Sequence, residues 1–336
     1  MPPATLPPAA APRRRPARVR LPGRQWVDLF YDLAIAAGII ALSGSFSSDH
    51  SAMGALWFAV TYAVMGCLWF ITSALTGAYS ADPPGPSAGW VALVVVQLAL
   101  VLLLPVAAGD ELAAADAVFD LLLGGALVVS VVLALRGPGR GPARSGPVAG
   151  LLAGAAVVLG GSWWAQGPAT VIVWLLSLAL VGAAVGILAS SRGMDPHRVA
   201  HRLGELTIVV LGEILVKLVL TLAEESLASV SVAGLAATFA VLILVWWGYF
   251  GLAQAGADLS RSARRLVWVV AHFPFHLGLL ALAVGLAKAS VGSSTLTEHG
   301  AWWALLVAPA GLSIGALVVL RRAAHPAPRP PEPDSA

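Results

Sequence analysis

Long apolar runs separated by short polar breaks make up most of this chain and govern its predicted structure. A helix rises about 1.5 Å per residue, so about 20 apolar residues cross the hydrocarbon core of a bilayer. Several of the breaks contain Pro, Gly and Asp, which favour turns. The predicted spans are 27–47, 54–78, 89–108, 113–135, 146–164, 169–190, 202–222, 231–255, 266–290 and 301–320.

This pattern predicts an all-α, polytopic integral membrane protein of about ten transmembrane helices. We expect residues 1–24 to form a disordered Arg/Pro-rich cytoplasmic arm, 25–322 the transmembrane domain, and 323–336 a disordered cytoplasmic tail. Composition agrees, because 58% of the residues are hydrophobic and 11% are charged, whereas a soluble domain has about a quarter of its residues charged. The first predicted partner is therefore the lipid bilayer.

The basic residues predict an orientation, because inner loops of membrane proteins are rich in Lys and Arg. With the N-terminus inside, the inner segments hold arginines near 136–144, 192–202, 261–265 and 321–329, while the outer loops hold no Lys or Arg. Both termini are thus predicted to lie in the cytoplasm, with the chain in the bacterial cytoplasmic membrane. Placement at inner loops accounts for the net charge of +3, so no nucleic-acid partner is predicted.

Several titratable residues fall within the predicted spans, where each costs about 2.5–3.5 kcal/mol at a helix centre. By helical rise, Asp32, Glu205 and His272 lie roughly 6–9 Å from the inner end, Glu213 and His276 roughly 15–18 Å from it, and Asp120 about 10 Å from the outer face. If their helices pack together, these groups form a ladder across the bilayer. The candidate functional residues are Asp32, Glu213, His272, His276, Glu205, Arg202, Lys217 and Asp120.

Simpler roles are open for several candidates. Glu213 and Lys217 have the spacing of an i,i+4 ion pair, which fits a structural role as well as a functional one. His272 and His276 have H-x-x-x-H spacing, but Pro274 between them predicts a kink, so buried core histidines are favoured over a metal site. Tryptophans near helix ends predict an aromatic belt at the membrane surfaces: Trp69, Trp90, Trp163, Trp164, Trp302 and Trp303.

Three segments together resemble the bacterial low temperature requirement protein A family. The run V-D-L-F-Y-D-L at 27–33 is similar to the family's E-L-F-F-D-L. The run H-R-V-A-H-R-L-G-E-L-T-I-V-V-L-G-E at 197–213 is similar to H-L-x-E-R-x-G-L-x-T-I-I-V-L-G-E. The run H-F-P-F-H-L-G at 272–278, followed by A-V-G-L at 283–286, is similar to H-x-P-x-x-x-G and A-V-G-L.

The match retains four polar positions of the family and departs at two others. His201 stands where the family has Glu, and Gly251 stands where it usually has Asp, which marks a divergent member. The resemblance implies a polytopic inner-membrane protein, and the family takes its name from growth in the cold rather than from a substrate. The retained residues are Asp32, Arg202, Glu213 and His272.

The favoured function is a proton- or cation-coupled transporter or permease for an unidentified small solute or ion, with titratable groups at several depths. The first alternative is a membrane-embedded enzyme acting on a lipid or isoprenoid through Asp32, Glu213 and His272. A second alternative is a scaffold or sensor of membrane state. The chain has no P-loop, G-x-S-x-G or H-E-x-x-H motif, and no cofactor or metal is predicted. Convergence of Asp32, Glu213 and His272 on one cavity would support the transporter and the enzyme, and separate packing interfaces would weaken both.

Overall fold

The structure, a computed structural model, describes most of the 336-residue chain. The described residues are 24–77, 88–107, 112–136, 142–165, 168–191, 194–225, 229–254, 257–292, 300 and 303–325. The predicted disordered arm and tail lie outside this part of the chain, except at their inner edges. The described residues form helices and no strands, in the order α1 Arg24–Ser48, α2 Ala52–Gly77, α3 Ala88–Ala107, α4 Leu112–Arg136, α5 Pro142–Gly160, η1 Gly161–Trp164, α6 Pro168–Ala189, α7 Pro196–Glu224, α8 Val232–Trp246, η3 Trp247–Gln254, α9 Ser262–Ser290, η5 Trp303–Val307 and α11 Ala308–Ala324.

Each of the ten predicted spans overlaps a helix, which confirms a polytopic helical membrane protein. Within the described residues, nine helices are long and apolar enough to cross a bilayer, and a shorter apolar helix covers Val91–Pro105. Helix α7 begins six residues before the predicted span because Asp195 caps it, accepting from the His197 backbone N–H at 2.9 Å, and Pro196 occupies the first turn.

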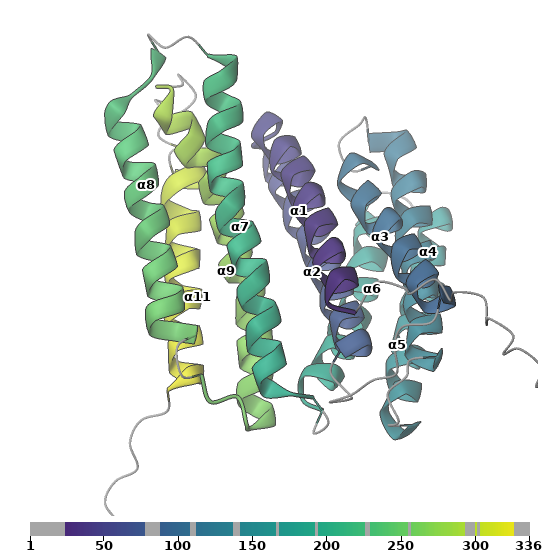
Figure 1. Ribbon diagram of the computed structural model, residues 1–336. Coiled ribbons are helices and arrows are strands. Elements are labelled where there is room, and N and C mark those ends of the chain that lie inside the picture. Colours follow the sequence, from purple (N-terminus) through teal and green to yellow (C-terminus); the bar gives the residue numbers. More distant parts are fainter. Residues whose placement is uncertain are drawn as a thin grey trace, which may run out of the picture.

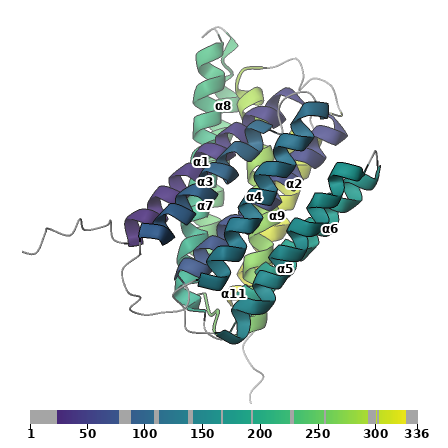
Figure 2. The same cartoon turned by 90° about the vertical axis from the view of Figure 1, so that its right-hand side faces the viewer.

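The helices gather into two groups that meet along α1 and α2 (Figure 1). Helices α3 to α6 pack in sequence order beside α1 and α2, whereas α7, α8, α9 and α11 stand together on the other side. Helix α9 is the most buried of the candidate spans and contacts α1, α2, α6, α7, α8 and α11. A view from the side shows α1, α3 and α4 crossing in front of α9 (Figure 2). Side chains on α1, α2, α7 and α9 therefore face a shared interior.

Small residues let α9 and α11 approach closely. A Cβ atom at Gly278 would lie 2.5 Å from Ser313 Oγ and 2.9 Å from the Pro309 carbonyl oxygen, and one at Gly285 would overlap the Leu305 carbonyl oxygen. Close backbone approach through glycine is a common way to pack helices in lipid, where dispersion contacts rather than the hydrophobic effect drive association.

Two segments of π-helix interrupt the otherwise α-helical spans. The first, η3, continues α8, and the second, η5, precedes α11. A π-helical turn widens the helix and redirects the side chains on it, and such turns occur frequently at functional sites. Here η3 turns Tyr249 toward α9.

The ends of the α7–α9 pair differ in charge, and we name them from it. The arginine end comprises the starts of α7 and α9 and the end of α11, with Arg198, Arg261 and Arg322. At this end, hydrogen bonds from Ser260 and the nearby charge of Arg264 lower the pKa of Asp258, which lies in the loop before α9. The lysine end comprises the ends of α1, α7 and α9.

Candidate functional site

Six of the eight candidate residues lie along one contact region, here called the central interface, where α1, α2, α7 and α9 meet. His272 lies on the adjoining side of α9, and Asp120 lies apart, between α4, η1 and α6. Following α7 from the arginine end to the lysine end, the central interface holds Asp32, Arg202, Glu205, His276, Glu213 and Lys217.

Asp32 and Arg202 form a buried ion pair at the arginine end. Arg202 Nη1 lies 2.5 Å from Asp32 Oδ2 and Nη2 lies 2.7 Å from Oδ1, so the guanidinium and the carboxylate face each other in fork geometry. Arg202 also donates to Glu205 Oε2 at 3.0 Å and to Ser73 Oγ at 3.2 Å. Asp32 is 5% exposed, and this pairing offsets the cost of removing its charge from water.

Trp69 completes this cluster and corrects a prediction. Its indole Nε1 donates to Asp32 Oδ1 at 2.8 Å, and the Arg202 guanidinium carbon lies 5.4 Å from the centre of its ring, within reach of a cation–π interaction. From its position near the end of a predicted helix, Trp69 was expected in an aromatic belt at the membrane surface. That was wrong, because Trp69 is 1% exposed and belongs to the core. Trp163, Trp164 and Trp303 are exposed, as a belt requires.

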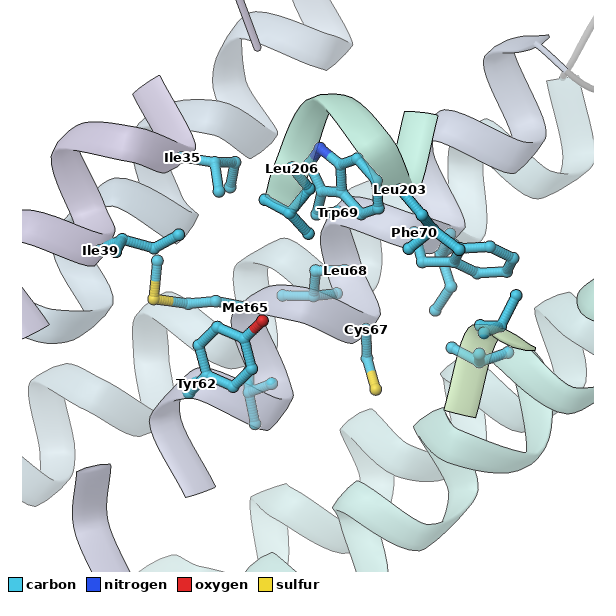
Figure 3. Packing of buried hydrophobic residues seen from close by; sticks show 14 of the residues in the cluster. Ile35, Ile39, Tyr62, Met65, Cys67, Leu68, Trp69, Phe70, Leu203 and Leu206 are labelled. Carbon is cyan, nitrogen blue, oxygen red and sulfur yellow. The ribbon is translucent and has the colours of Figure 1, made fainter. Parts of the chain in front are cut away.

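Two small cavities lie on either side of a partition made by Trp69, Phe70 and Leu203. The one toward the arginine end is also lined by Arg198 and Arg202. The other cavity is also lined by His272, His276 and Tyr62. Each has room for about one or two water molecules. Figure 3 shows Trp69 and Phe70 of α2 beside Leu203 and Leu206 of α7, with the Tyr62 ring further along α2.

His276 has both ring nitrogens hydrogen-bonded, and its tautomer follows from its partners. The Thr207 hydroxyl gives its single proton to the Leu203 carbonyl oxygen at 2.8 Å, so it accepts from His276 Nε2 at 2.9 Å. His276 Nδ1 then accepts from the Tyr62 hydroxyl at 2.9 Å. His276 is 1% exposed, and this arrangement satisfies a neutral imidazole without leaving a buried charge.

His272 takes the opposite tautomer. Its Nδ1 lies 2.6 Å from the Trp268 carbonyl oxygen, which can only accept, so Nδ1 carries the proton and Nε2 accepts from the Tyr249 hydroxyl at 2.7 Å. The Thr207 hydroxyl, which contacts His276, also lies near Tyr249, so hydroxyl groups lie beside both histidines. The ring centroids of His272 and His276 lie 5.3 Å apart, so Pro274 does not turn them to separate faces of α9.

Glu213 lies deeper along the same interface, toward the lysine end. The Ser43 hydroxyl of α1 contacts Glu213 Oε1 and also lies 3.1 Å from the Ile40 carbonyl oxygen, while Glu213 Oε2 has no hydrogen-bond partner in the described part of the chain. The predicted ion pair with Lys217 is absent from the described contacts. Their charges interact only at longer range.

The lysine end holds Lys217, Lys288 and His50. His50 Nδ1 lies 2.8 Å from the Phe46 carbonyl oxygen, so it donates there and leaves Nε2 to accept from the Lys288 ammonium at 2.5 Å. The charges of Lys217 and Lys288 interact across α7 and α9. His50 lies in a predicted outer loop, between the spans 27–47 and 54–78, so its contact with α9 could not be predicted from local sequence.

Asp120 forms a separate buried cluster in the α3–α6 group. Its Oδ1 accepts from Trp174 Nε1 at 2.8 Å, and Ser162 of η1 contacts its Oδ2. This repeats the hydrogen bond between Trp69 and Asp32. Asp120 is thus not part of the ladder predicted from helix depth.

Arg265 is buried, although the charge pattern assigned it to an inner segment between helices. It donates to backbone carbonyl oxygens of Ala189 at 3.2 Å, Ser191 at 2.9 Å, and Leu259 and Ser260 at 2.9 Å each. The carbonyls at the end of α6 carry partial negative charge, so they stabilise this guanidinium. Arg265 therefore joins the two helix groups at the arginine end.

Among the described residues, neither of the two small cavities brings Asp32, Glu213 and His272 together. His272 lines the cavity beside Tyr62, Asp32 contacts the partition at Trp69, and Glu213 lines neither of these two cavities. Asp32 and Glu213 lie at different points along the central interface, and His272 lies beside it. Within the described residues, no three His, Cys, Asp or Glu side chains gather as a metal site.

Comparison with known proteins gives a family and no closer relative. No curated protein matches the chain, and no solved structure matches it. The profile of the bacterial low temperature requirement A protein (LtrA) matches residues 25–331, which include every side chain of the central interface. The chain therefore belongs to the LtrA family of bacterial membrane proteins.

Proposed function

We propose that this protein is a proton-coupled membrane transporter in which protons move along the central interface. The observation that supports this most directly is the succession of buried titratable groups between the arginine end and the lysine end. Lys217 follows Arg202 by fifteen positions in α7, which is about 22 Å at about 1.5 Å per residue. Ionisable side chains inside a membrane are costly, and their alignment is typical of proton relays.

The orientation supports a direction for the path. The described arginines of α7, α9 and α11 gather at one end, which the positive-inside rule assigns to the cytoplasm. The protein is then a multi-pass protein of the bacterial cytoplasmic membrane, with both termini inside. In this orientation the Asp32–Arg202 pair lies nearer the cytoplasmic side of the membrane. Glu213 lies further along α7, toward the opposite side.

Each group on the path has a definite role in this proposal. Glu213 holds a proton, because a protonated carboxyl can donate to Ser43, whose own proton then goes to the Ile40 carbonyl oxygen. An ionised Glu213 would leave Oε2 buried and unpaired. His276 and His272 relay a proton by binding it at one ring nitrogen and releasing one from the other, which changes their tautomer. The hydroxyl groups of Tyr62, Thr207 and Tyr249 are their hydrogen-bond partners in this step. When the path opens, the Asp32 carboxylate separates from Arg202 and takes up a proton.

The small cavities favour a proton or a small ion as the coupled species. Each holds about one or two water molecules, and Trp69 with its neighbours separates them. This is the geometry of a closed state, in which the partition blocks continuous water between the two cavities. Movement of α2 against α7 would join them.

The decisive test is a proton-flux assay on the purified full-length chain in proteoliposomes, driven by a pH gradient and a membrane potential. Glu213→Gln and Asp32→Asn are each expected to lower the flux by at least about tenfold, because neither amide can release a proton. Asp120→Asn is the matched control, since it neutralises a buried carboxyl of similar exposure away from the path. Unchanged flux in both path variants would remove the relay.

The same variants separate transport from a scaffold or sensor role. A scaffold would support growth in the cold with Asp32 and Glu213 neutralised, because its contacts depend on shape. A transporter with this relay would not. Growth of a deletion strain complemented by each variant at low temperature distinguishes the two outcomes.

A further inference from the structure

The lysine end of the central interface holds two cations that the proton path does not use. Of the 20 Lys and Arg residues in the chain, only Lys217 and Lys288 are lysines, and both lie in membrane-spanning helices. Both are half-buried, and their charges interact. Thr207 of α7 contacts His276 of α9, and Lys217 and Lys288 follow this contact by ten and twelve residues, so both lie at a similar depth. Two half-buried like charges at one end of neighbouring helices repel, so their position calls for a counter-charge.

Among the described residues, no contact with Lys217 or Lys288 supplies this counter-charge. Lys288 donates to the neutral Nε2 of His50, which accepts one of its three N–H groups and contributes no charge. No carboxylate of the described residues makes an ion pair with either lysine. Glu213 and Glu224 act on Lys217 only through space.

The helix dipole accounts for one lysine and not for the other. Lys288 lies in the last turn of α9, where the free carbonyls stabilise a cation. Lys217 lies seven residues before the end of α7, about 10 Å away, beyond the range over which the dipole acts. An external anion between α7 and α9 would neutralise both.

We propose that Lys217, Lys288 and His50 form a binding site for an oxyanion, a carboxylate or phosphate group, whose occupancy is coupled to protonation of Glu213. An ionised Glu213, one helical turn from Lys217, competes with the anion for the ammonium. A protonated Glu213 does not compete, so proton and oxyanion each favour the binding of the other. This coupling rests on the proposed function and makes the protein a proton–oxyanion symporter.

The charged groups around the site set its pH dependence. Helix α7 contributes Glu213 and Glu224, α9 contributes Lys288, and the segment after α1 contributes Asp49 and His50. Oxyanion affinity therefore falls as pH rises and Glu213 ionises. The oxyanion could be a soluble solute or the headgroup phosphate of an anionic lipid, because both present the same oxygens.

Lysine-selective labelling tests the site directly. In the purified full-length chain, an amine reagent can modify only Lys217, Lys288 and the N-terminal amine, and mass spectrometry reports each position separately. Inorganic phosphate is expected to slow labelling of both lysines by at least about fivefold at pH 6 and less at pH 8. Labelling of the N-terminal amine stays unchanged and serves as the internal reference. Glu213→Gln is expected to raise the protection at pH 8 relative to the unsubstituted chain, because no carboxylate at this position then competes with the anion.

A second arm identifies the source of the anion. Nanodiscs of phosphatidylglycerol are compared with nanodiscs of phosphatidylcholine, both without free phosphate. Protection in phosphatidylglycerol alone, with none by free phosphate in micelles, assigns the site to a lipid headgroup. Protection by free phosphate in micelles assigns it to a soluble oxyanion.

Variants of the lysines decide between a shared site and separate effects. Lys217→Met is expected to abolish the protection of Lys288, Lys217→Arg to retain it, and the exposed Arg322→Met at the arginine end to have no effect. The proposal is overturned if neither phosphate nor anionic lipid protects, or if Lys217→Met leaves Lys288 fully protected. Because labelling needs no gradient, this failure would leave the flux results for Asp32→Asn intact, and failure of proton flux would leave the anion site intact.

Discussion

Asp32 on α1 and Arg202 on α7 are 170 positions apart in the chain and meet through two hydrogen-bonded contacts, of 2.5 and 2.7 Å. The pair joins the two helix groups, and Trp69 of α2 donates to the same carboxylate. The contact therefore ties three helices together at the arginine end.

Removing one partner of this pair should cost more than removing both. Arg202→Met leaves Asp32 buried beside Trp69 without a cation, so unfolding should become easier by about 3–5 kcal/mol. Adding Asp32→Asn should recover part of this loss, because the buried charge is then gone. Unfolding in mixed micelles of the two single variants and the double variant gives the coupling energy. Strictly additive costs would show that the pair contributes nothing as a unit.

Trp69 should keep water out of the path between the cavities. Trp69→Ala removes the largest side chain of the partition shared by the two cavities, so water should connect them and uncoupled proton leak should rise several-fold. Trp174→Ala is a matched control, because Trp174 makes the same 2.8 Å bond to a buried aspartate away from the path. The measurement is dye-reported acidification of proteoliposomes without substrate. Equal leak in both variants would deny Trp69 this role.

Tyr249 should contribute through its hydroxyl. Tyr249→Phe leaves the His272 Nε2 acceptor unpaired in the core, at a cost of about 1–3 kcal/mol. Tyr31→Phe is the comparison, since that buried hydroxyl makes only a long 3.4 Å contact with Thr72 and should cost less. Chemical unfolding of both variants checks the difference, and equal costs would contradict the hydrogen-bond assignment at His272.

Arg265 should be indispensable for stability. Arg265→Met leaves carbonyl oxygens at the end of α6 and in the loop before α9 without their donor, and hydrogen bonds to a charged group contribute about 1.5–3 kcal/mol each. We expect a loss of at least about 3 kcal/mol. Arg261→Met, on an exposed neighbour, should have little effect. Thermal unfolding in detergent measures both, and a small loss at Arg265 would contradict its role in joining the two groups.

Gly285 should not tolerate a side chain. Gly285→Ala places a methyl group against the Leu305 backbone, and overpacking of this kind costs about 1–3 kcal/mol. Gly315→Ala on α11 meets nothing within 4 Å and should leave stability unchanged or slightly higher. The comparison uses the same unfolding assay. If both substitutions are tolerated equally, α9 is packed less tightly against η5 than the contact between Gly285 and Leu305 indicates.

The sequence by itself determined the helical membrane architecture and the family. Crossing a bilayer requires about 20 apolar residues per helix, and this constraint is local, so hydropathy located a helix at each predicted span. Charge placement along the loops predicted the orientation for the same reason. The resemblance at Asp32, Arg202, Glu213 and His272 was local too, because it depended on order and spacing alone.

Only the tertiary structure decided which polar groups meet. Helix depth placed Asp120 in the ladder, yet its carboxylate accepts a hydrogen bond from Trp174 of α6, away from the central interface. Local spacing paired Glu213 with Lys217, but the nearer partner is Ser43, 170 positions away. The burial of Trp69 and Arg265 likewise depends on neighbours far apart in the chain. A contact between helices is fixed by their crossing and rotation, and no short stretch of sequence specifies either.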